Sequence, residues 1–311
     1  MDENARKTLS EIGSQLDQHL EIPVYNGGIV KPSDIPVTPL TLGKGDQYVR
    51  SRQSNQEKPR RSKTRPRQGP APRQGTTNRS RASGQTRPII GSNLLEKYEE
   101  ELGDLQTAYP GTKVWHQAEG LWLLSTSELL SGSGLQATFL TAMPYIATQQ
   151  PKSWGFWTTA ISANWIGPRH TNFPDGSVCA FEPSDDTWLY EDGILTLLDQ
   201  YTLWAARHLY LKTFDRWPGR QVAHHPYERI TEFRDNEYCG CLHSDRLYEH
   251  CCKESDSAED ETKLKADYVQ NISGFIPRKP PASVTQFIHD KKALPNMINI
   301  FARAIRPNGL P

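Results

Sequence analysis

Two stretches of the sequence place apolar residues at helical spacing. In each, leucines and aromatic residues recur every three or four positions, and a Pro-Gly pair follows, at 110–111 and 218–219. We therefore expect a helix over Asn93–Tyr109 and a longer helix from Gly193. The residues predicted to face the core are Leu94, Leu95, Tyr98, Leu102 and Leu105 in the first helix, and Ile194, Leu197, Leu198, Tyr201, Trp204, Ala205, His208 and Leu211 in the second.

The region between these helices has the pattern of strands. Residues 113–125, 135–145 and 153–167 are rich in Trp, Leu, Phe and Thr, with a Gly/Ser cluster at 131–134 and Pro144 as breaks. These segments predict a meander of strands. The order helix, strands, cysteine-bearing loop and helix is typical of an α+β fold and not of alternating βαβ units.

The first 91 residues are mostly polar, and we expect them to form a mostly disordered, Arg-rich tail. One short amphipathic helix is possible from Leu9 to Leu20, whereas residues 44–91 contain almost no apolar residue, so we expect disorder there. Residues 50–87 hold twelve Lys or Arg and one acid, Glu57, which gives this stretch a net charge of +11. Because the whole chain is neutral, the remainder carries about −11, and the overall pI does not indicate a partner.

No apolar run is long enough to predict a transmembrane helix. The N-terminus, MDENARKTLSEIG, lacks the pattern of a signal peptide, and we expect a cytoplasmic protein. Thiols stay reduced in that compartment, so clustered cysteines there favour a metal site over disulfides.

Four of the five cysteines lie together, in the stretch CGCLHSDRLYEHCC. Cys239, Cys241, Cys251 and Cys252 provide the four thiolates that a closed, structural, tetrahedral zinc site requires. The alternative is a set of cysteines that are merely buried. The stretch also resembles the SEC-C metal-binding motif, with an extra residue between the cysteine pairs and His243 in place of the Gly before Ser. With that change, His243 or His250 is a possible substitute ligand.

The fifth cysteine, Cys179, follows the turn sequence FPDGS. Its position between two irregular segments favours accessibility, but a free thiol is mostly protonated at neutral pH. Its chemistry alone leaves two alternatives open, a nucleophile and a buried structural cysteine.

The stretch HTNFPDGSVC resembles the active-site signature of ubiquitin-conjugating enzymes, with Thr171 in place of the family's Pro and a loop one residue shorter. The order of elements is also similar, with Trp188 downstream of the cysteine. The second half resembles the bacterial branch linked to type II CBASS anti-phage systems. The residues that carry this similarity are Trp188, Trp204–Ala205, Trp217–Gly219 and His224 or His225.

The resemblance implies a thioester on Cys179 and a transfer to an amine. It implies that Asn172 hydrogen-bonds the oxyanion and that Asp185 or Asp186 accepts a proton from the incoming amine. For His170 two roles are open, orienting the loop and taking part directly in catalysis. It also implies a conjugating-like domain over 92–225, a zinc-binding segment over 226–256 and a C-terminal extension over 257–311 with a short helix at Met297–Ile305.

The partners follow from the same chemistry. The chain has neither G-x-G-x-x-G nor a P-loop, so a separate activating enzyme must supply the activated carboxyl group. The conjugated partner would be a ubiquitin-like protein or a CD-NTase-type nucleotidyltransferase. A second hypothesis is an inactive conjugating-like adaptor, in which the zinc segment binds protein and the basic tail makes weak phosphate contacts with nucleic acid.

Overall fold

The computed structural model divides the chain into two compact units, residues 1–34 with 88–311, and residues 35–87. All residues that the structure describes belong to the first unit, and the predicted disorder over 44–91 lies outside them. The described residues are 1–18, 24–25, 27–29, 92–130, 135–159, 162–180, 187–223, 225–241, 245–273, 278–290 and 293–302.

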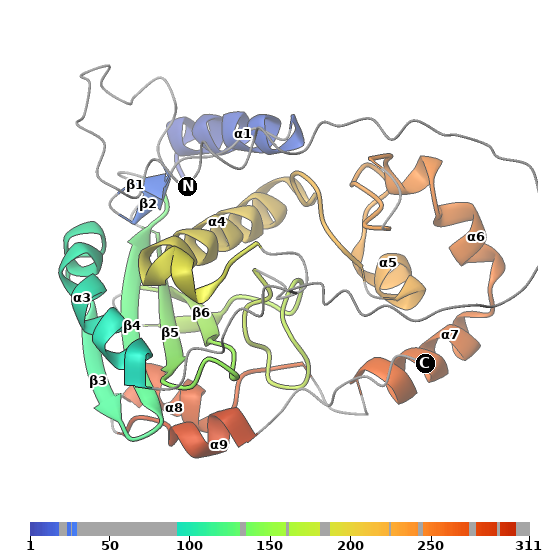
Figure 1. Cartoon of the computed structure of the whole chain (residues 1–311). Helices are drawn as coiled ribbons and strands as arrows, with labels where there is room; N and C mark the ends of the chain where they lie inside the picture. Colours follow the sequence, from blue (N-terminus) through green and yellow to red (C-terminus); the bar gives the residue numbers. More distant parts are fainter. Residues whose placement is uncertain are drawn as a thin grey trace, which may run out of the picture. The chain divides into compact units, whose positions relative to one another are not determined.

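The centre of the first unit is an antiparallel sheet of five strands in chain order, which confirms the α+β class (Figure 1). The first predicted segment contains two strands, because a turn at Ala118 and Glu119 divides it into a hairpin. The third segment also contains two paired strands. The strands are β3 (Lys113–Gln117), β4 (Gly120–Glu128), β5 (Gln136–Pro144), β6 (Lys152–Thr158) and β7 (Ala163–Trp165).

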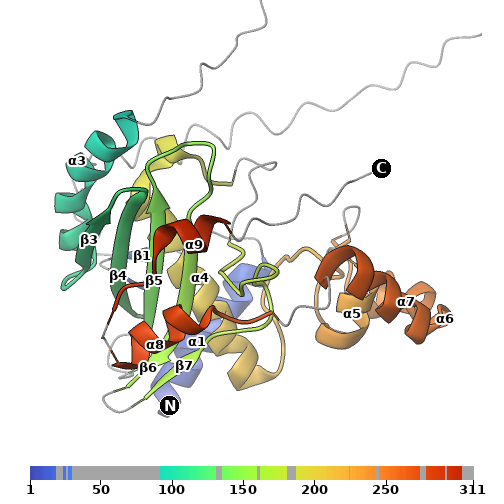
Figure 2. The ribbon, with the colours of Figure 1, turned by 90° about the horizontal axis from the view of Figure 1, so that it is seen from below.

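Helices cover both faces of this sheet, because its strands bury both of their faces. On β4, Leu121 and Leu123 pack in the core formed with α3 (Ser92–Ala108) and α4 (Gly193–Phe214), whereas Trp122 points to the opposite face. The opposite core contains residues of α8 (Ala282–Asp290) and α9 (Met297–Ala302), which Figure 2 shows over the sheet. Residues 303–305 of the predicted C-terminal helix lie outside the described residues.

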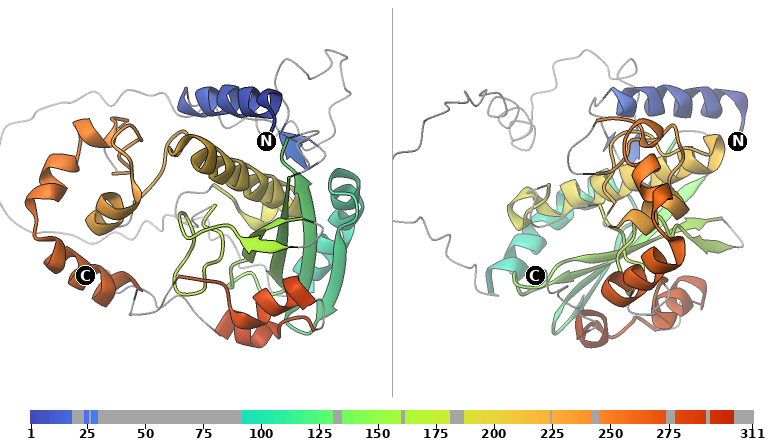
Figure 3. Two further views of the ribbon diagram at one scale, coloured as in Figure 1. Left: turned by 180° about the vertical axis from the view of Figure 1, so that it is seen from behind. Right: turned by 90° about the vertical axis from the view of Figure 1, so that its right-hand side faces the viewer.

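A helix is present near the N-terminus, but it begins six residues earlier than the predicted Leu9–Leu20 and ends at Asp17: α1 (Glu3–Asp17) packs along α4 (Figures 1 and 3). Leu9 and Ile12 are buried in the same core as α4. The approach is close: a Cβ at Gly13 would lie 2.0 Å from the Tyr210 ring, so a larger residue does not fit there. A two-stranded hairpin, β1 (Val24–Tyr25) and β2 (Gly28–Ile29), follows α1.

This packing explains why α4 is more buried than its apolar face predicted. The predicted core residues of α4 are buried, apart from the half-buried Leu211. Thr202, Ala206 and Leu209 are also buried, although the predicted face did not include them. A helix that is covered by a sheet on one side and by another helix on a second side loses its clean amphipathic pattern.

After α4 the chain forms a region of short helices around the cysteine cluster and then returns to the sheet through Arg278 and α8 (Figure 1). A buried bidentate ion pair fastens this region internally, with Arg229 Nε and Nη2 each 2.7 Å from the Asp256 carboxylate. Its elements are α5 (Pro226–Glu232), the 3-10 helix η4 (Tyr248–His250), α6 (Lys253–Ala258), α7 (Glu261–Tyr268) and the π-helical turn η5 (Val269–Ser273).

Candidate functional site: Cys179 and the four-cysteine cluster

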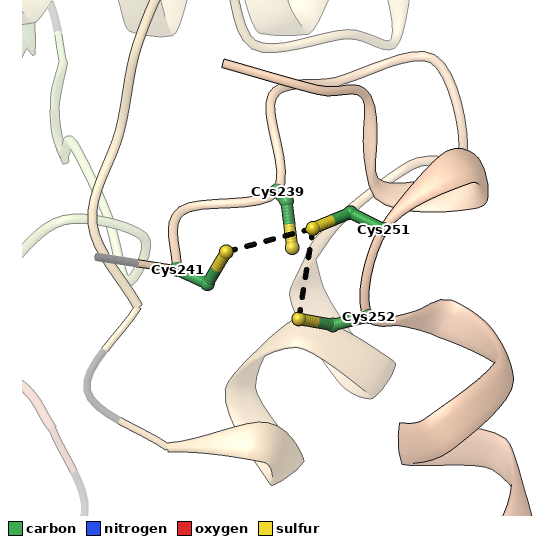
Figure 4. Close-up of side chains that lie close together, drawn as sticks. All are labelled: Cys239, Cys241, Cys251 and Cys252. Atoms are coloured by element: carbon green, nitrogen blue, oxygen red, sulfur yellow. Dashed lines mark hydrogen bonds between the residues drawn. The ribbon is translucent and has the colours of Figure 1, made fainter. Parts of the chain in front are cut away.

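The four cysteines predicted as ligands converge in space. Their Sγ atoms all lie within 4.8 Å of one another, and Figure 4 shows them pointing to a common centre. The Cys241 and Cys251 sulfurs are 3.6 Å apart, and those of Cys251 and Cys252 are 3.8 Å apart. This group can hold a metal ion.

The geometry fits a tetrahedral thiolate site. Zn–S bonds of ~2.3 Å in a tetrahedron place the sulfurs about 3.8 Å apart, which agrees with the observed separations. Burial raises the pKa of the Cys239 thiol, and burial together with the neighbouring thiols raises that of Cys252. A bound cation would reverse this effect, because metal coordination deprotonates thiols.

The folding of this segment explains the convergence. Cys239 is fully buried with Phe233 and Tyr248, and the remaining sulfurs pack against this small core. The suggested substitute ligand His250 is not part of the cluster: its side chain is exposed, with Nε2 3.2 Å from Glu249. The other, His243, lies outside the described residues.

Cys179 is separate from this cluster and ends a short hairpin-like turn. Its backbone N–H donates to the His170 carbonyl at 3.1 Å, and Thr171 pairs with Val178 one residue further in. The side chain is half-buried and its thiol is free of disulfides. Cys179 is therefore held by its backbone at the exit of the turn, as the sequence FPDGS predicted.

The Asn172 amide lies inside this turn. Its Nδ2 donates to the Val178 carbonyl at 3.2 Å and to Ser177 Oγ at 3.3 Å, while its backbone N–H donates to the Ser177 carbonyl at 2.7 Å. Asn172 does not line the cavity that contains Cys179. In this arrangement the Asn172 side chain fixes the backbone of Val178, the residue before Cys179. The contact of Asn172 with an oxyanion stays a prediction.

His170 is held in a buried position next to the turn. Its Nε2 lies 3.0 Å from Gln221 Oε1, and its ring centroid is 4.3 Å from that of Trp217. Burial, assisted by the positive charge of Arg169, holds the pKa of His170 well below its usual value. The ring is therefore neutral near pH 7, and the role of His170 at the site stays a prediction.

Arg169 joins this loop to the cysteine-cluster segment. Its guanidinium forms a bidentate pair with the Glu237 carboxylate, two residues before Cys239, and donates to Gln221 Oε1 at 2.6 Å. The Glu237 carboxylate also accepts the Trp217 backbone N–H at 2.6 Å. The Cys179 loop and the cysteine-cluster segment therefore share one buried ion pair.

A cavity of about 390 Å³ opens beside Cys179. One wall is a single face of α4, because Gln200, Leu203, Trp204 and Arg207 follow each other at helical spacing. Trp204 is fixed at this wall by an Nε1 hydrogen bond of 2.9 Å to the His170 carbonyl. The other walls of the cavity include Trp217 and the charged residues Arg220, Glu228, Glu232 and Arg278.

The segment that leads to α8 crosses the turn. Arg278 donates to the Thr171 carbonyl at 3.4 Å, pairs with Glu232, and lies over the Phe173 ring at 4.7 Å. A Cβ at Gly176 would lie 2.7 Å from the Lys279 carbonyl carbon, and its φ of +63° also favours glycine. The turn before Cys179 is therefore held in place by contacts with Arg278 and Lys279, which precede α8.

The sequence analysis missed the buried charges of this site. Arg169, Glu237, Arg207 and Arg278 were not predicted, because single arginines and glutamates in a charged sequence carry no distinctive spacing; only Arg207 has a signal, at i+3 from Trp204 on the predicted helix. The predicted proton acceptor Asp185, like Asp186, lies outside the described residues.

Of the other residues that carried the predicted resemblance, Trp188 is buried and donates from Nε1 to the Gly193 carbonyl at 3.0 Å. His225 caps α5, and its Nε2 lies 2.9 Å from Asp267.

Among the described helices, none combines the length and the apolar character that a bilayer crossing requires. Comparisons with protein-family models, with curated proteins and with solved structures found no match to this chain. The function is therefore argued from the two cysteine sites themselves.

Proposed function

We propose that the protein is a ubiquitin-conjugating-like transferase, which accepts a protein C-terminus as a thioester on Cys179 and transfers it to an amine. The observation that carries this proposal is the position of Cys179: it is the single cysteine outside the cluster, and its half-buried thiol lines a cavity of about 390 Å³. A structural cysteine would be packed in a core, whereas a nucleophile has to reach a substrate.

The order of elements supports the proposal. A helix (α3), an antiparallel meander (β3 to β7), the Cys179 turn and a long helix (α4) follow each other as the resemblance in the sequence implies. The turn is held by internal hydrogen bonds and by the contacts with Arg278, so the thiol has a fixed place at the cavity wall. Positioning of this kind is the main contribution that a thioester carrier makes to catalysis.

The chemistry consists of two acyl transfers. In the first, the Cys179 thiolate attacks the carbonyl carbon of a thioester on an activating enzyme; a new C–S bond forms, and the activating enzyme's thiolate leaves. In the second, an amine attacks the acyl group; a C–N bond forms, the bond to the Cys179 sulfur breaks, and the amine loses a proton to solvent or a nearby base. Activation of the carboxyl group takes place on the partner enzyme, at the expense of ATP.

For the four-cysteine cluster we propose a structural Zn²⁺ ion. Four thiolates leave no open coordination position, so the ion would supply folding energy to residues 226–258 and no chemistry to the reaction. The supporting observations are the Sγ separations and the small size of the apolar core around Cys239. Through Glu237 and Arg169 the folded segment would also hold the Cys179 loop.

The test is acyl capture from a small thioester. Zinc-saturated protein is incubated with the benzyl thioester of N-acetylglycine, and intact mass spectrometry follows addition of one acetylglycyl group. We expect one adduct, which is removed by hydroxylamine and is absent in Cys179→Ala. Cys179→Ser serves as the matched control, because any adduct on the serine oxygen resists brief hydroxylamine treatment.

An adduct that persists in Cys179→Ala would contradict the site assignment. A chain that forms no adduct, although Cys179 reacts with iodoacetamide, would favour the inactive adaptor. The predicted partners, a ubiquitin-like protein or a CD-NTase-type nucleotidyltransferase in anti-phage defence, are then tested with a purified activating enzyme and ATP.

A further inference from the structure

The cavity beside Cys179 contains the half-buried Arg207, whose guanidinium has no ion-pair partner among the described residues. Arg207 lies on the α4 wall of the cavity, and its Nε atom is inaccessible to solvent. Among the described residues, this Nε atom has no hydrogen-bond acceptor. Burial lowers the pKa of Arg207 to about 10, which still leaves the group charged at pH 7.

The other charges of the cavity are engaged. Arg278 Nη1 lies 3.6 Å from Glu228, and its Nη2 pairs with Glu232. Arg220 lies 2.8 Å from Asp245, and both of these side chains are more than half exposed. Both lining acids therefore contact Arg278, and among the described residues no acid lies within ion-pair distance of Arg207.

A desolvated guanidinium without a partner is unfavourable unless a ligand supplies the missing acceptor. A planar fork of N–H donors matches the two oxygens of a carboxylate, or the single oxygen of a carbonyl that becomes negative during attack. A second donor is available at the same cavity: Trp217 is one of its lining residues, and the buried Nε1 atom of Trp217 has no acceptor among the described residues.

We propose that Arg207 is an anion-binding residue, which holds the negatively charged oxygen of a carboxyl-derived group next to Cys179. The identification of that group as the acyl chain carried by Cys179 rests on the proposed function. A donor other than Asn172 is needed at the acyl oxygen, because the Asn172 amide already donates to Ser177 Oγ and to the Val178 carbonyl within the turn. Arg207 then provides the charge stabilisation at the carbonyl oxygen that the resemblance assigns to an asparagine.

The experiment compares two alkylating agents that differ in charge. Second-order rate constants for Cys179 are measured with iodoacetate, an anion, and with iodoacetamide, which is neutral, on the zinc-saturated full chain. Their ratio isolates anion binding, because any change in thiolate fraction affects both reagents equally. We expect Arg207→Gln to lower the iodoacetate-to-iodoacetamide ratio about tenfold, the size of one charge-assisted hydrogen bond.

Arg220→Gln is the matched control, because it removes a positive charge from the same cavity at an exposed, paired position. Its ratio should stay within about twofold of wild type, since solvent and salt screen exposed charges. Thermal midpoints of both variants establish that they are folded. An unchanged ratio in Arg207→Gln would overturn the proposal.

Two further arms settle the source of the anion. The variant Glu182→Gln/Asp185→Asn/Asp186→Asn neutralises the acids that follow Cys179 in the sequence. A raised ratio there, with no effect of Arg207→Gln in the wild-type background, would show an internal ion pair and would contradict a ligand role. N-acetylglycine that protects Cys179 from iodoacetamide, where N-acetylglycinamide does not, would identify a free carboxylate as the ligand.

Slower aminolysis of a preformed acetylglycyl thioester in Arg207→Gln would identify the acyl oxygen instead. These outcomes are distinguishable from a failure of the proposed function. The alkylation ratio depends only on Arg207 and the free thiol, whereas acyl capture depends on Cys179 as a nucleophile toward thioesters. A chain that fails to capture an acyl group can still show the Arg207-dependent ratio.

Discussion

The buried pair between Arg169 and Glu237 makes a sharp prediction about stability. The Glu237 side chain is 0% exposed and that of Arg169 is 7% exposed. Glu237 accepts from the Arg169 guanidinium, from the Trp217 backbone N–H at 2.6 Å and from Gln221 Nε2 at 3.3 Å. Glu237→Gln keeps the shape of the side chain but removes the counter-charge and turns one acceptor into a donor.

Removing one member of a buried ion pair costs about 3–5 kcal/mol, because the other charge stays buried. We expect the lower end for Glu237→Gln, since Arg169 keeps Gln221 Oε1 as an acceptor and lies over the rings of Trp217 and Phe233, at 5.3 and 4.8 Å. For a body of this size each kcal/mol shifts the midpoint by about 2–4 °C, so a loss of about 3 kcal/mol lowers Tm by about 6–12 °C.

Thermal unfolding followed by circular dichroism on zinc-saturated protein measures this shift. Asp245→Asn, at an exposed ion pair, is the control and should leave Tm unchanged. The double variant Arg169→Met/Glu237→Gln should be more stable than Glu237→Gln alone, because no buried charge remains. A Tm for Glu237→Gln within 2 °C of wild type (about 1 kcal/mol at most), or a double variant as unstable as the sum of the singles, would refute the reasoning.

Three other predictions follow from the structure. Elemental analysis should find one zinc per chain in wild type and in Cys179→Ser, and close to none in Cys251→Ser; equal loss in both variants would contradict the assignment of ligands. Burial lowers the pKa of His208 to about 3, so between pH 6 and pH 4 the unfolded chain binds a proton that the folded chain does not, and the free energy of unfolding should fall by about 1.4 kcal/mol per pH unit from this residue. This contribution to stability is fully present above the unfolded pKa of ~6.5, and urea titrations of His208→Gln should lack it. Leu9→Ala, in the buried face of α1, should cost about 3 kcal/mol in the same urea assay, whereas no loss would mean that α1 does not belong to the core.

Periodicity alone predicted the main elements around the sheet. The helices α3 and α4 begin within a residue or two of the positions expected, and the apolar segments between them are strands. The cysteine cluster was predicted in full, because four ligands close in sequence need little of the fold to meet. These features depend on local spacing, which a single sequence contains.

The parts that were not predicted depend on long-range contacts. No helix was predicted at α8. A short apolar segment can be assigned as a helix only when the surface that it covers is known, and here that surface is the face of the sheet that contains Trp122 and Trp154. The pairing of Arg169 with Glu237 joins residues 68 positions apart, and neither has a sequence pattern that indicates its partner. The environment of Arg207 depends in the same way on a cavity whose walls come from five separate segments.

The cover of the second sheet face has a consequence for the synthesis of the chain. Trp122 and Trp154 are synthesised by the time β6 is complete, but the helices that bury them follow only after the cysteine-cluster segment. A nascent chain therefore carries an exposed aromatic surface while more than a hundred further residues are translated. Such intermediates are prone to aggregate, so the yield of folded protein should depend on chaperones that shield this surface and on zinc that is available during translation.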